Sequence, residues 1–493
     1  MWGFESPPGH LIIFSKFFKL KITFFQQSIE NNIRLLRMKK AKNSLFLAYV
    51  RIHKGENMKK KSIVGLLLVL SLLLGACGNS LEGQEVIYFG APATDGPDGQ
   101  AIQSSFDAFT EETGIIVTYV GSENFESELL AQIEAGNPPN IALWPQPGTV
   151  RAQAEAGNLI PLADLGVDLE EYRANFSPYL VGLGEVDGVP YGGAHAVNLK
   201  SIVWYQPAEF ESRGYSVPDT WDEMIALADQ IVADGMTPFC FGMYSNGATG
   251  WLATDWMEDI MLRTGNGTTS YDQWVNHEIP FNDPIVKNAA TYLSQIMHTD
   301  GYVVGGTDAI VSTFFGDAQN PMFERDGNGN PGCFMHRQAS FIPGFWPEDA
   351  KAGLGTETTF FPFPDMEVPS DTVLGAGDMW AVLVNDEATQ KVVEFMLSEN
   401  YFDAIATDKA GTGSTRISAH IGFDTSKYWS PTTQKQADFL KAALAANVFR
   451  FDGSDNMPPE VGSGSFWSEM TELAVQGPSY IDTALDNIEK SWP

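Results

Sequence analysis

Short apolar runs alternate with amphipathic segments between residues 86 and 144. Residues 86–90 and 115–120 are rich in Val, Ile, Tyr and Phe, which predicts strands. Residues 102–112 place apolar side chains at helical spacing, and a second such segment at 125–135 precedes a third apolar run at 141–144. This strand–helix alternation predicts parallel βαβ units and an α/β sheet.

Further along the chain the pattern predicts longer helices, over 221–233, 254–264 and 286–298, which begin after Thr or Asp caps. Strand character returns at 379–384, and we expect the Gly-rich residues 375–378 to form a turn that enters this strand. An α/β segment, a helix-rich segment and a returning segment together predict two lobes joined by repeated crossings of a hinge.

The division of the chain follows these changes of pattern. We expect residues 85–200 to lie mainly in one lobe and residues 201–375 mainly in a second lobe. Residues 376–493 are expected to return and to be shared between the lobes.

The chain also contains a targeting segment. Basic residues at 59–61 precede an apolar run at 63–74, so residues 58–76 are predicted to be a signal peptide. The ending Leu-Gly-Ala-Cys resembles the bacterial lipobox, which implies lipidation of Cys77 and a flexible spacer within 77–84. A plain signal peptide with an incidental cysteine is the alternative.

Residues 1–57 precede this signal and carry basic and Phe-rich stretches that an exported lipoprotein does not need. Residues 54–57 can be encoded by a purine-rich ribosome-binding sequence immediately before Met58. We therefore interpret residues 1–57 as a mis-called upstream extension. A genuine basic leader is the alternative, and the codons at 54–57 distinguish the two.

The net charge excludes one class of partner. The chain carries 30 Lys+Arg and 62 Asp+Glu, a formal charge of −32. An acidic chain repels a phosphate backbone, so nucleic acid is not an expected partner. With so many carboxylates, a pair at catalytic spacing arises by chance, so paired acids are no evidence for acid–base catalysis.

Cys240 and Cys333 are the cysteines that remain outside the signal segment. Two cysteines in an oxidising compartment favour one disulfide, with two buried free thiols as the alternative. The sequence has no CxxC or HExxH motif, so no metal site is expected. It also lacks a phosphate-binding glycine loop and a GxSxG elbow, so we expect no cofactor and no catalytic residue.

Several Trp residues lie in polar, Gly-rich surroundings, which suits the apolar faces and hydroxyl rims of sugars. A series of short motifs then resembles, in order and spacing, the bacterial extracellular solute-binding proteins of sugar ABC importers, particularly the α-glucoside subgroup. The resemblance covers nearly all of residues 85–493. Its motifs are Phe106–Ile115, Gly136–Gly148, Gly157–Leu162, Gly188–Gly192, Val203–Gln206, Pro218–Glu223 and Phe451–Pro458.

This resemblance implies a two-lobed periplasmic-binding-protein fold, in which a cleft between α/β lobes closes on a ligand. It implies a receptor that captures an α-glucoside or short oligosaccharide, performs no reaction on it and delivers it to the permease subunits of an ABC importer. We expect a monomer, anchored through Cys77 to the outer face of the cytoplasmic membrane or in the periplasm. A binder of a non-sugar solute and a surface glycoside hydrolase are the alternatives. Asn140 and Gln206 depart from the family motifs without changing this class.

The resemblance also implies site residues. It places a stacking aromatic at Trp144, followed by Gln146 as a hydroxyl partner, and a sugar-contacting tyrosine at Tyr205. Trp251 is expected to form a stacking floor, with Asp255 as a hydroxyl acceptor. A core role for Trp144 and a helix-cap role for Asp255 are the alternatives.

Other candidates come from position in the predicted elements. Glu123 and Asn124 lie between a strand and a helix, a common ligand-facing position in α/β lobes. Gly377 lets the backbone approach a ligand while Asp378 reaches its hydroxyls, with a simple tight turn as the alternative. Arg416 is expected to donate to hydroxyls, and a structural ion pair is its alternative.

Overall fold

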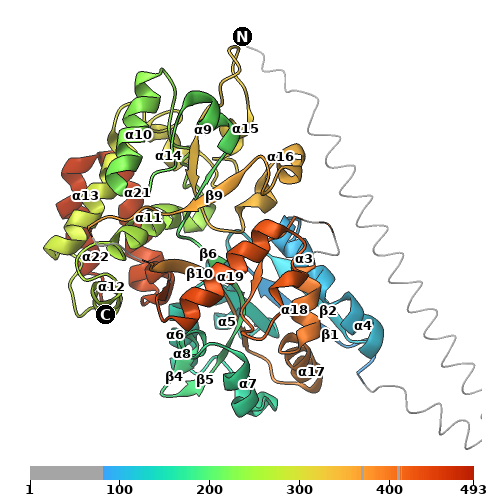
Figure 1. Ribbon diagram of the computed structural model, residues 1–493. Helices are drawn as coiled ribbons and strands as arrows, with labels where there is room; N and C mark the ends of the chain where they lie inside the picture. Colours follow the sequence, from blue (N-terminus) through green and yellow to red (C-terminus); the bar gives the residue numbers. More distant parts are fainter. Residues whose placement is uncertain (1–80, 368–370, 408–410, 412) are drawn as a thin grey trace, which may run out of the picture. The chain divides into compact units, whose positions relative to one another are not determined.

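The computed structural model shown in Figure 1 describes residues 81–367, 371–407, 411 and 413–493. The described residues belong to one compact unit, Asn79–Pro493. The expected extension 1–57, the signal peptide 58–76 and Cys77 lie outside the described residues. Within the described part of the chain, no helix has the length and apolar character needed to cross a bilayer.

The first hydrophobic core surrounds a mixed sheet whose order is β11-β6-β10-β3-β1-β2, with β12 beside β10. The strands β1, β2 and β3 pair in parallel, as the predicted βαβ units require, whereas β10 is antiparallel to both β3 and β6. The strands are β1 (Glu85–Gly90), β2 (Ile116–Gly121), β3 (Ile141–Trp144), β6 (Gly192–Leu199), β10 (Val373–Val382), β11 (Ile417–Ser418) and β12 (Phe449–Phe451).

Helices from distant parts of the chain cover this sheet, so that the blue α3 lies beside the orange α18 in Figure 1. The single helix expected at 102–112 is instead two helices, because the chain breaks at the fully buried Phe106. The elements are α3 (Pro97–Ser105), α4 (Asp107–Thr113), α5 (Phe125–Glu134), α6 (Pro147–Glu155), η1 (Leu162–Leu165), α7 (Leu169–Asn175), α8 (Pro178–Leu183), the hairpin β4 (Glu185–Val186) and β5 (Val189–Pro190), α17 (Glu387–Met396), α18 (Glu399–Ala406), η4 (Thr425–Lys427) and α19 (Pro431–Ala445).

The second hydrophobic core is mainly helical, and Figure 1 shows its C-terminal red helices beside the green and yellow ones. Its small sheet has the order β8-β7-β9. The elements between β6 and β10 and after β12, of which η3 and α16 pack on the first core, are β7 (Ile202–Tyr205), α9 (Pro207–Arg213), α10 (Trp221–Ala233), η2 (Asn246–Ala248), α11 (Trp251–Met261), α12 (Thr268–Val275), α13 (Pro284–His298), α14 (Thr307–Ser312), α15 (Asn320–Phe323), β8 (Met335–Arg337), η3 (Ile342–Phe345), α16 (Glu348–Ala352), β9 (Thr359–Pro362), α20 (Gly453–Asn456), η5 (Glu460–Phe466), α21 (Trp467–Gln476), η6 (Pro478–Tyr480) and α22 (Ile481–Glu489).

The chain passes between the two cores several times, and its crossing segments are hydrogen-bonded to one another. The Lys200 N–H, between β6 and β7, donates to the Leu374 carbonyl at 2.9 Å. The Asp452 N–H, between β12 and α20, donates to the Gly375 carbonyl at 2.7 Å. These adjacent segments form the connection about which two lobes can move.

The Gly-rich residues 375–378 do not form a turn, contrary to the expectation from the sequence. They lie inside β10 and pair with β6, with an irregularity in register between Asp378 and Met379. A Cβ atom at Gly377 would lie 2.1 Å from the Ala196 carbonyl oxygen, so this glycine permits close approach of two strands.

The folded part begins earlier than Glu85. Leu81, expected in the flexible spacer, is 5% exposed and packs in the first core. The Gly83 N–H donates to the Gly114 carbonyl at 2.8 Å, which ties this segment to the end of α4. The polar composition of the spacer did not predict this contact, which a single apolar residue, Leu81, provides.

The expected disulfide between Cys240 and Cys333 is confirmed, with the two Cα atoms 5.5 Å apart. The bridge joins residues separated by 93 positions and packs against Met322. Nδ1 of the buried His336 donates to the Cys240 carbonyl at 2.8 Å, which adds a hydrogen bond beside the covalent link.

Candidate functional site

A cavity of about 230 Å³ lies where residues of both cores come together. The loops that follow β1, β2 and β3 supply Pro92, Glu123 and Gln146 to its wall. The carboxyl ends of parallel strands meet at one edge of a sheet, so these loops converge there. The crossing segment between β6 and β7 adds Lys200, and α20 adds Asp455.

Most of the residues predicted from the sequence line this cavity. They are Glu123, Gln146, Trp251, Gly377, Asp378 and Arg416. Glu123 and Gln146 reach it because each follows a parallel strand, and Trp251 because it is the first residue of α11. The cavity therefore combines a Trp ring with amide, carboxyl and guanidinium groups.

The structure places the other predicted residues outside the cavity. Trp144 is 2% exposed and packs edge-on against Phe125 in the first core, which was its alternative role. Tyr205 packs edge-on against Phe210 and Phe361. Asn124 is exposed and directly precedes α5.

Asp255 is fully buried in the middle of α11, because this helix begins at Trp251 rather than at 254. It is therefore neither a helix cap nor part of the cavity lining. Its carboxylate lies 2.6 Å from the Lys200 ammonium and 3.0 Å from the Arg337 guanidinium. The described structure thus gives Asp255 a role in a buried ion-pair network.

Lys200 is the centre of this network and also lines the cavity. Its Nζ lies 2.5 Å from Asp452, and 5.0 Å from the centroid of the Trp251 ring. Burial alone would lower the pKa of Lys200, but the carboxylates of Asp255 and Asp452 raise it, so the ammonium stays charged. The Trp251 ring is therefore held over a fixed positive charge.

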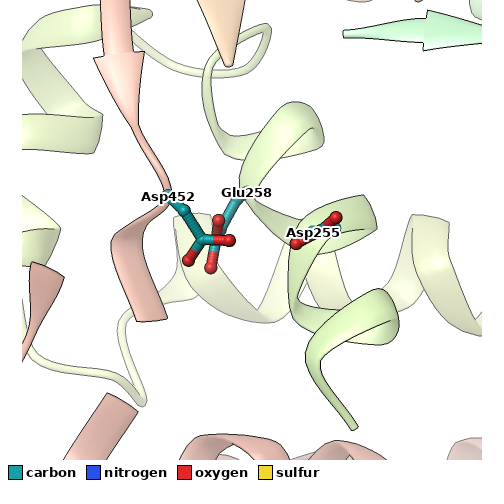
Figure 2. A group of neighbouring side chains, drawn as sticks. All are labelled: Asp255, Glu258 and Asp452. Atoms are coloured by element: carbon teal, nitrogen blue, oxygen red, sulfur yellow. The ribbon is translucent and has the colours of Figure 1, made fainter. Parts of the chain in front are cut away.

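Figure 2 shows the carboxyl groups of Asp255, Glu258 and Asp452 close together, on α11 and the crossing segment before α20. The Lys200 ammonium lies against both Asp255 and Asp452, and Arg337 adds a second positive charge beside Asp255. Burial, and then Asp452, raise the pKa of Glu258 well above its ordinary value, so Glu258 is a neutral acid. This group of acids thus has an internal cation as its partner.

Arg416 lines the cavity and forms the structural ion pairs that were the alternative considered for it. It is 3% exposed, and its guanidinium is paired with Asp98 at 3.2 Å and with Asp378. Ser414 donates to the second oxygen of Asp98 at 2.6 Å. The charged side chains of Asp98, Asp378 and Arg416 are therefore held in ion pairs, and all three residues line the cavity.

Glu126 and Asp455 line the cavity and were not predicted. Burial raises the pKa of Glu126, although it accepts a hydrogen bond from Gln146 at 3.2 Å. Burial, together with the charge of Asp452, raises the pKa of Asp455 well above its ordinary range. Carboxyl oxygens accept hydrogen bonds from hydroxyl groups, and the raised pKa of Asp455 favours a protonated form that also donates one.

A hydrogen-bonded strap joins the two cores beside the cavity. Glu123, in the loop after β2, accepts a 2.5 Å hydrogen bond from the side-chain amide of Asn246. Asn246 in turn accepts from the Tyr244 hydroxyl at 2.7 Å. Asn246 has a φ of 48°, a conformation that Asn tolerates better than most residues.

Four phenylalanines in the lining were also missed: Phe314, Phe315, Phe341 and Phe345. Each lies next to Gly or Pro or between short elements, where no regular helix or strand explains an apolar side chain. That local context was the available signal.

Comparisons with known proteins agree with this architecture. The family model described as bacterial extracellular solute-binding protein matches residues 93–401. The osmoprotective compounds-binding protein GgtB of Synechocystis sp. is 36% identical over 441 residues, 88% of this chain and 100% of the relative. The alpha-glucosides-binding periplasmic protein AglE of Rhizobium meliloti is 36% identical over 428 residues, 84% of this chain and 88% of the relative.

Solved structures share the fold at low sequence identity. A chitin oligosaccharide binding protein matches with a TM-score of 0.65 and 18% identity, covering 82% of this chain and 97% of its own. The protein RafE, solved in complex with raffinose, matches with a TM-score of 0.60 and 19% identity, covering 82% and 98%. Together with the two cores, these similarities confirm the predicted two-lobed α/β fold.

Proposed function

The chain belongs to the bacterial extracellular solute-binding protein family, and on this premise we propose that it is the receptor of a sugar ABC importer. It captures an α-glucoside or short oligosaccharide in the cavity between its lobes. It then delivers the sugar to the membrane permease subunits and carries out no reaction on it.

The observation that carries this proposal is the composition of the cavity. Trp251 offers an aromatic surface, while Gln146, Glu126 and Asp455 offer groups that donate and accept hydrogen bonds. Pyranose rings need both an aromatic face and hydroxyl partners. The name of AglE supports α-glucosides as the ligand class, since that relative is 36% identical to this chain.

Closure of the lobes is the proposed means of capture. We assign residues 85–200 mainly to one lobe, 201–375 mainly to the other, and 376–493 to both, with the crossing segments as the hinge. The Asn246–Glu123 strap supports this scheme, because it links the two cores beside the cavity. Movement of the lobes away from each other would separate these two side chains, so in this scheme the strap forms on closure.

Lipid anchoring is the proposed mode of attachment. The lipobox-like sequence ending at Cys77 supports diacylation of this residue and retention on the outer face of the cytoplasmic membrane. The folded unit then stands outside the bilayer as a monomer, where it meets both the solute and the permease.

Thermal unfolding of the purified full-length protein tests the proposal. We expect maltose, trehalose, sucrose, maltotriose or glucose to raise the unfolding temperature, because a ligand that binds the native state stabilises it. Each sugar is recovered afterwards and analysed for products. A shift without turnover supports a receptor and identifies its ligand class.

A binder of osmoprotective compounds is a second candidate, favoured by the name of the relative GgtB. Non-sugar compatible solutes therefore belong in the same panel. A shift with one of them and with none of the sugars would overturn the α-glucoside proposal. Product formation would instead identify a surface glycoside hydrolase.

A further inference from the structure

Acidic residues outnumber basic residues in the cavity. Among the described residues of its lining, Lys200 and Arg416 carry a positive charge, and the acidic residues are Asp98, Glu123, Glu126, Asp378 and Asp455. An anion is stable in a buried site only where a positive charge balances it. The surroundings of Lys200 and Arg416 therefore decide whether the cavity can take an anionic ligand.

Arg416 lies between two carboxylates. It is buried, and its guanidinium pairs with Asp98 at 3.2 Å and with Asp378. The Ser414 hydroxyl donates to Asp98 at 2.6 Å and so helps to hold this carboxylate in place. One positive charge thus faces two negative charges, and these three side chains together carry an excess of negative charge.

Lys200 is also held by two carboxylates. Its ammonium lies 2.6 Å from Asp255 and 2.5 Å from Asp452. Arg337, which lies outside the lining, pairs with Asp255 as well. The charge of Lys200 is therefore matched within the protein, and a ligand anion that approached Lys200 would lie near the same carboxylates.

Helix N-termini are another source of positive potential, of about half an elementary charge each. Asp98 lies in the first turn of α3, and Glu123 directly precedes the N-cap of α5. Gln146, the N-cap of α6, donates to Glu126 at 3.2 Å. Acidic side chains thus lie at these termini. The N-terminus of α11 has no acidic residue in its first turn, but its partial charge is smaller than that of one carboxylate.

We propose that the cavity selects uncharged sugars and rejects anionic ones, such as uronates, aldonates and sugar phosphates, because carboxylates outnumber the cations of its lining. This inference rests on the proposed function and narrows it to uncharged ligands. A hydroxyl group donates to a carboxylate and can bind beside Asp98 or Asp378. A ligand carboxylate or phosphate would instead lose its water and meet charges of its own sign. Glu126 and Asp455 add acceptors that carry no positive charge in either protonation state.

Isothermal titration calorimetry with the full-length protein at pH 7.5 tests this selectivity. Each sugar of the thermal-unfolding panel is compared with an anionic counterpart: glucose with glucuronate, maltose with maltobionate, maltotriose with maltotrionate, and trehalose and sucrose with their 6-phosphates. We expect the uncharged member of a pair to bind about tenfold tighter or more, because the anion has no free cation as its partner.

Asp98→Asn tests whether charge causes the selectivity, because it removes one negative charge beside Arg416 and keeps the size of the side chain. The ratio of the two affinities should fall to about a third of the wild-type ratio or less. Asp107→Asn is the matched control, since Asp107 is an exposed residue at the start of α4, outside the lining. It should keep the wild-type ratio. Asp378→Asn takes the place of Asp98→Asn if that variant does not fold, as judged by circular dichroism, or no longer binds the sugar.

The outcomes separate this inference from the proposed function. An anionic sugar that binds as tightly as its uncharged counterpart would overturn the selectivity and leave the sugar receptor intact. An unchanged ratio in the folded Asp98→Asn protein would also overturn it, because size rather than charge would then cause the discrimination. Failure of every uncharged sugar in the panel to bind would overturn the proposed function, and this inference with it.

Discussion

Lys200 links the ligand cavity to the hinge through a single side chain. Its backbone lies in a crossing segment, its ammonium binds Asp255 of α11 and Asp452 of another crossing, and Trp251 lies above it. Removing one partner from a buried ion pair leaves an uncompensated charge, which costs several kcal/mol. Lys200 therefore connects an aromatic ring of the cavity lining to the segments that join the two cores.

His336 gives the protein a defined sensitivity to acid. It is 1% exposed, and burial lowers its pKa to about 4. In the unfolded chain a histidine binds a proton below about pH 6.5, whereas native His336 stays neutral until about pH 4. Above pH 6.5 this difference in pKa does not affect the free energy of unfolding. As the pH falls from 6.5 toward 4, the unfolded chain gains a proton that native His336 does not bind, so the free energy of unfolding decreases.

We expect the free energy of unfolding of the wild type to decrease, relative to that of His336→Asn, by about 2–3 kcal/mol between pH 7.5 and pH 4.5. The Asn side chain retains a donor for the Cys240 carbonyl but does not titrate in this range. Urea denaturation at the two pH values measures the difference. Parallel pH profiles for the two proteins would contradict this assignment.

At the scale of elements, β10 depends on Gly377 for its close approach to β6 beside the cavity. Gly377→Ala places a methyl group 2.1 Å from the Ala196 carbonyl, so β10 and β6 must separate. We expect a loss of about 1–3 kcal/mol in the free energy of unfolding, measured by urea denaturation.

Gly182→Ala is the control for this change. Gly182 is an exposed residue of α8, and no atom lies within 4 Å of a Cβ built there. Alanine favours a helix more than glycine does, so this variant should gain about 0.5–1 kcal/mol in stability. Equal effects of the two substitutions would show that strand approach is not the cause.

Periodicity predicted the elements that have one buried face. β1, β3, α5 and α10 occur where the pattern placed them, and α10 begins with the capping box of Thr220 and Glu223. The pattern failed where tertiary contact decides local structure. Phe106 breaks a helix because it is drawn into the core, and the glycines of β10 serve close packing rather than a turn.

The candidate site was predictable where topology determines position. Glu123 and Gln146 follow parallel strands, so the sheet brings them to the cavity whatever the rest of the fold does. Trp144 and Asp255 lie outside the cavity lining, because burial depends on which face of an element meets the core. The phenylalanines of the lining come from separate segments of the chain, which a single sequence does not bring together.

At the scale of the whole molecule, the proposed closure of the lobes makes a prediction about the strap, in which Asn246 donates a hydrogen bond to Glu123. Asn246→Asp places a carboxylate against Glu123 and keeps a residue that tolerates a positive φ. We expect sugar to dissociate about fivefold faster, because a hydrogen bond is replaced by repulsion. Stopped-flow fluorescence with the sugar identified by thermal unfolding measures this rate.

A second substitution checks the origin of that effect. Glu123→Gln in the Asn246→Asp background restores a donor opposite the new carboxylate, so the dissociation rate should return toward the wild-type value. A double variant as fast as Asn246→Asp alone would show that the strap does not hold the lobes closed.

The repeated crossing of the chain between its cores also affects biogenesis. The second core contains helices from the middle of the chain together with α21 and α22 at its end. During synthesis from the N-terminus, the middle helices exist long before their C-terminal partners, and their apolar faces stay uncovered until then. The chain therefore remains incompletely folded until nearly all of it has been made, and a protein in that state can still be threaded through a narrow export channel.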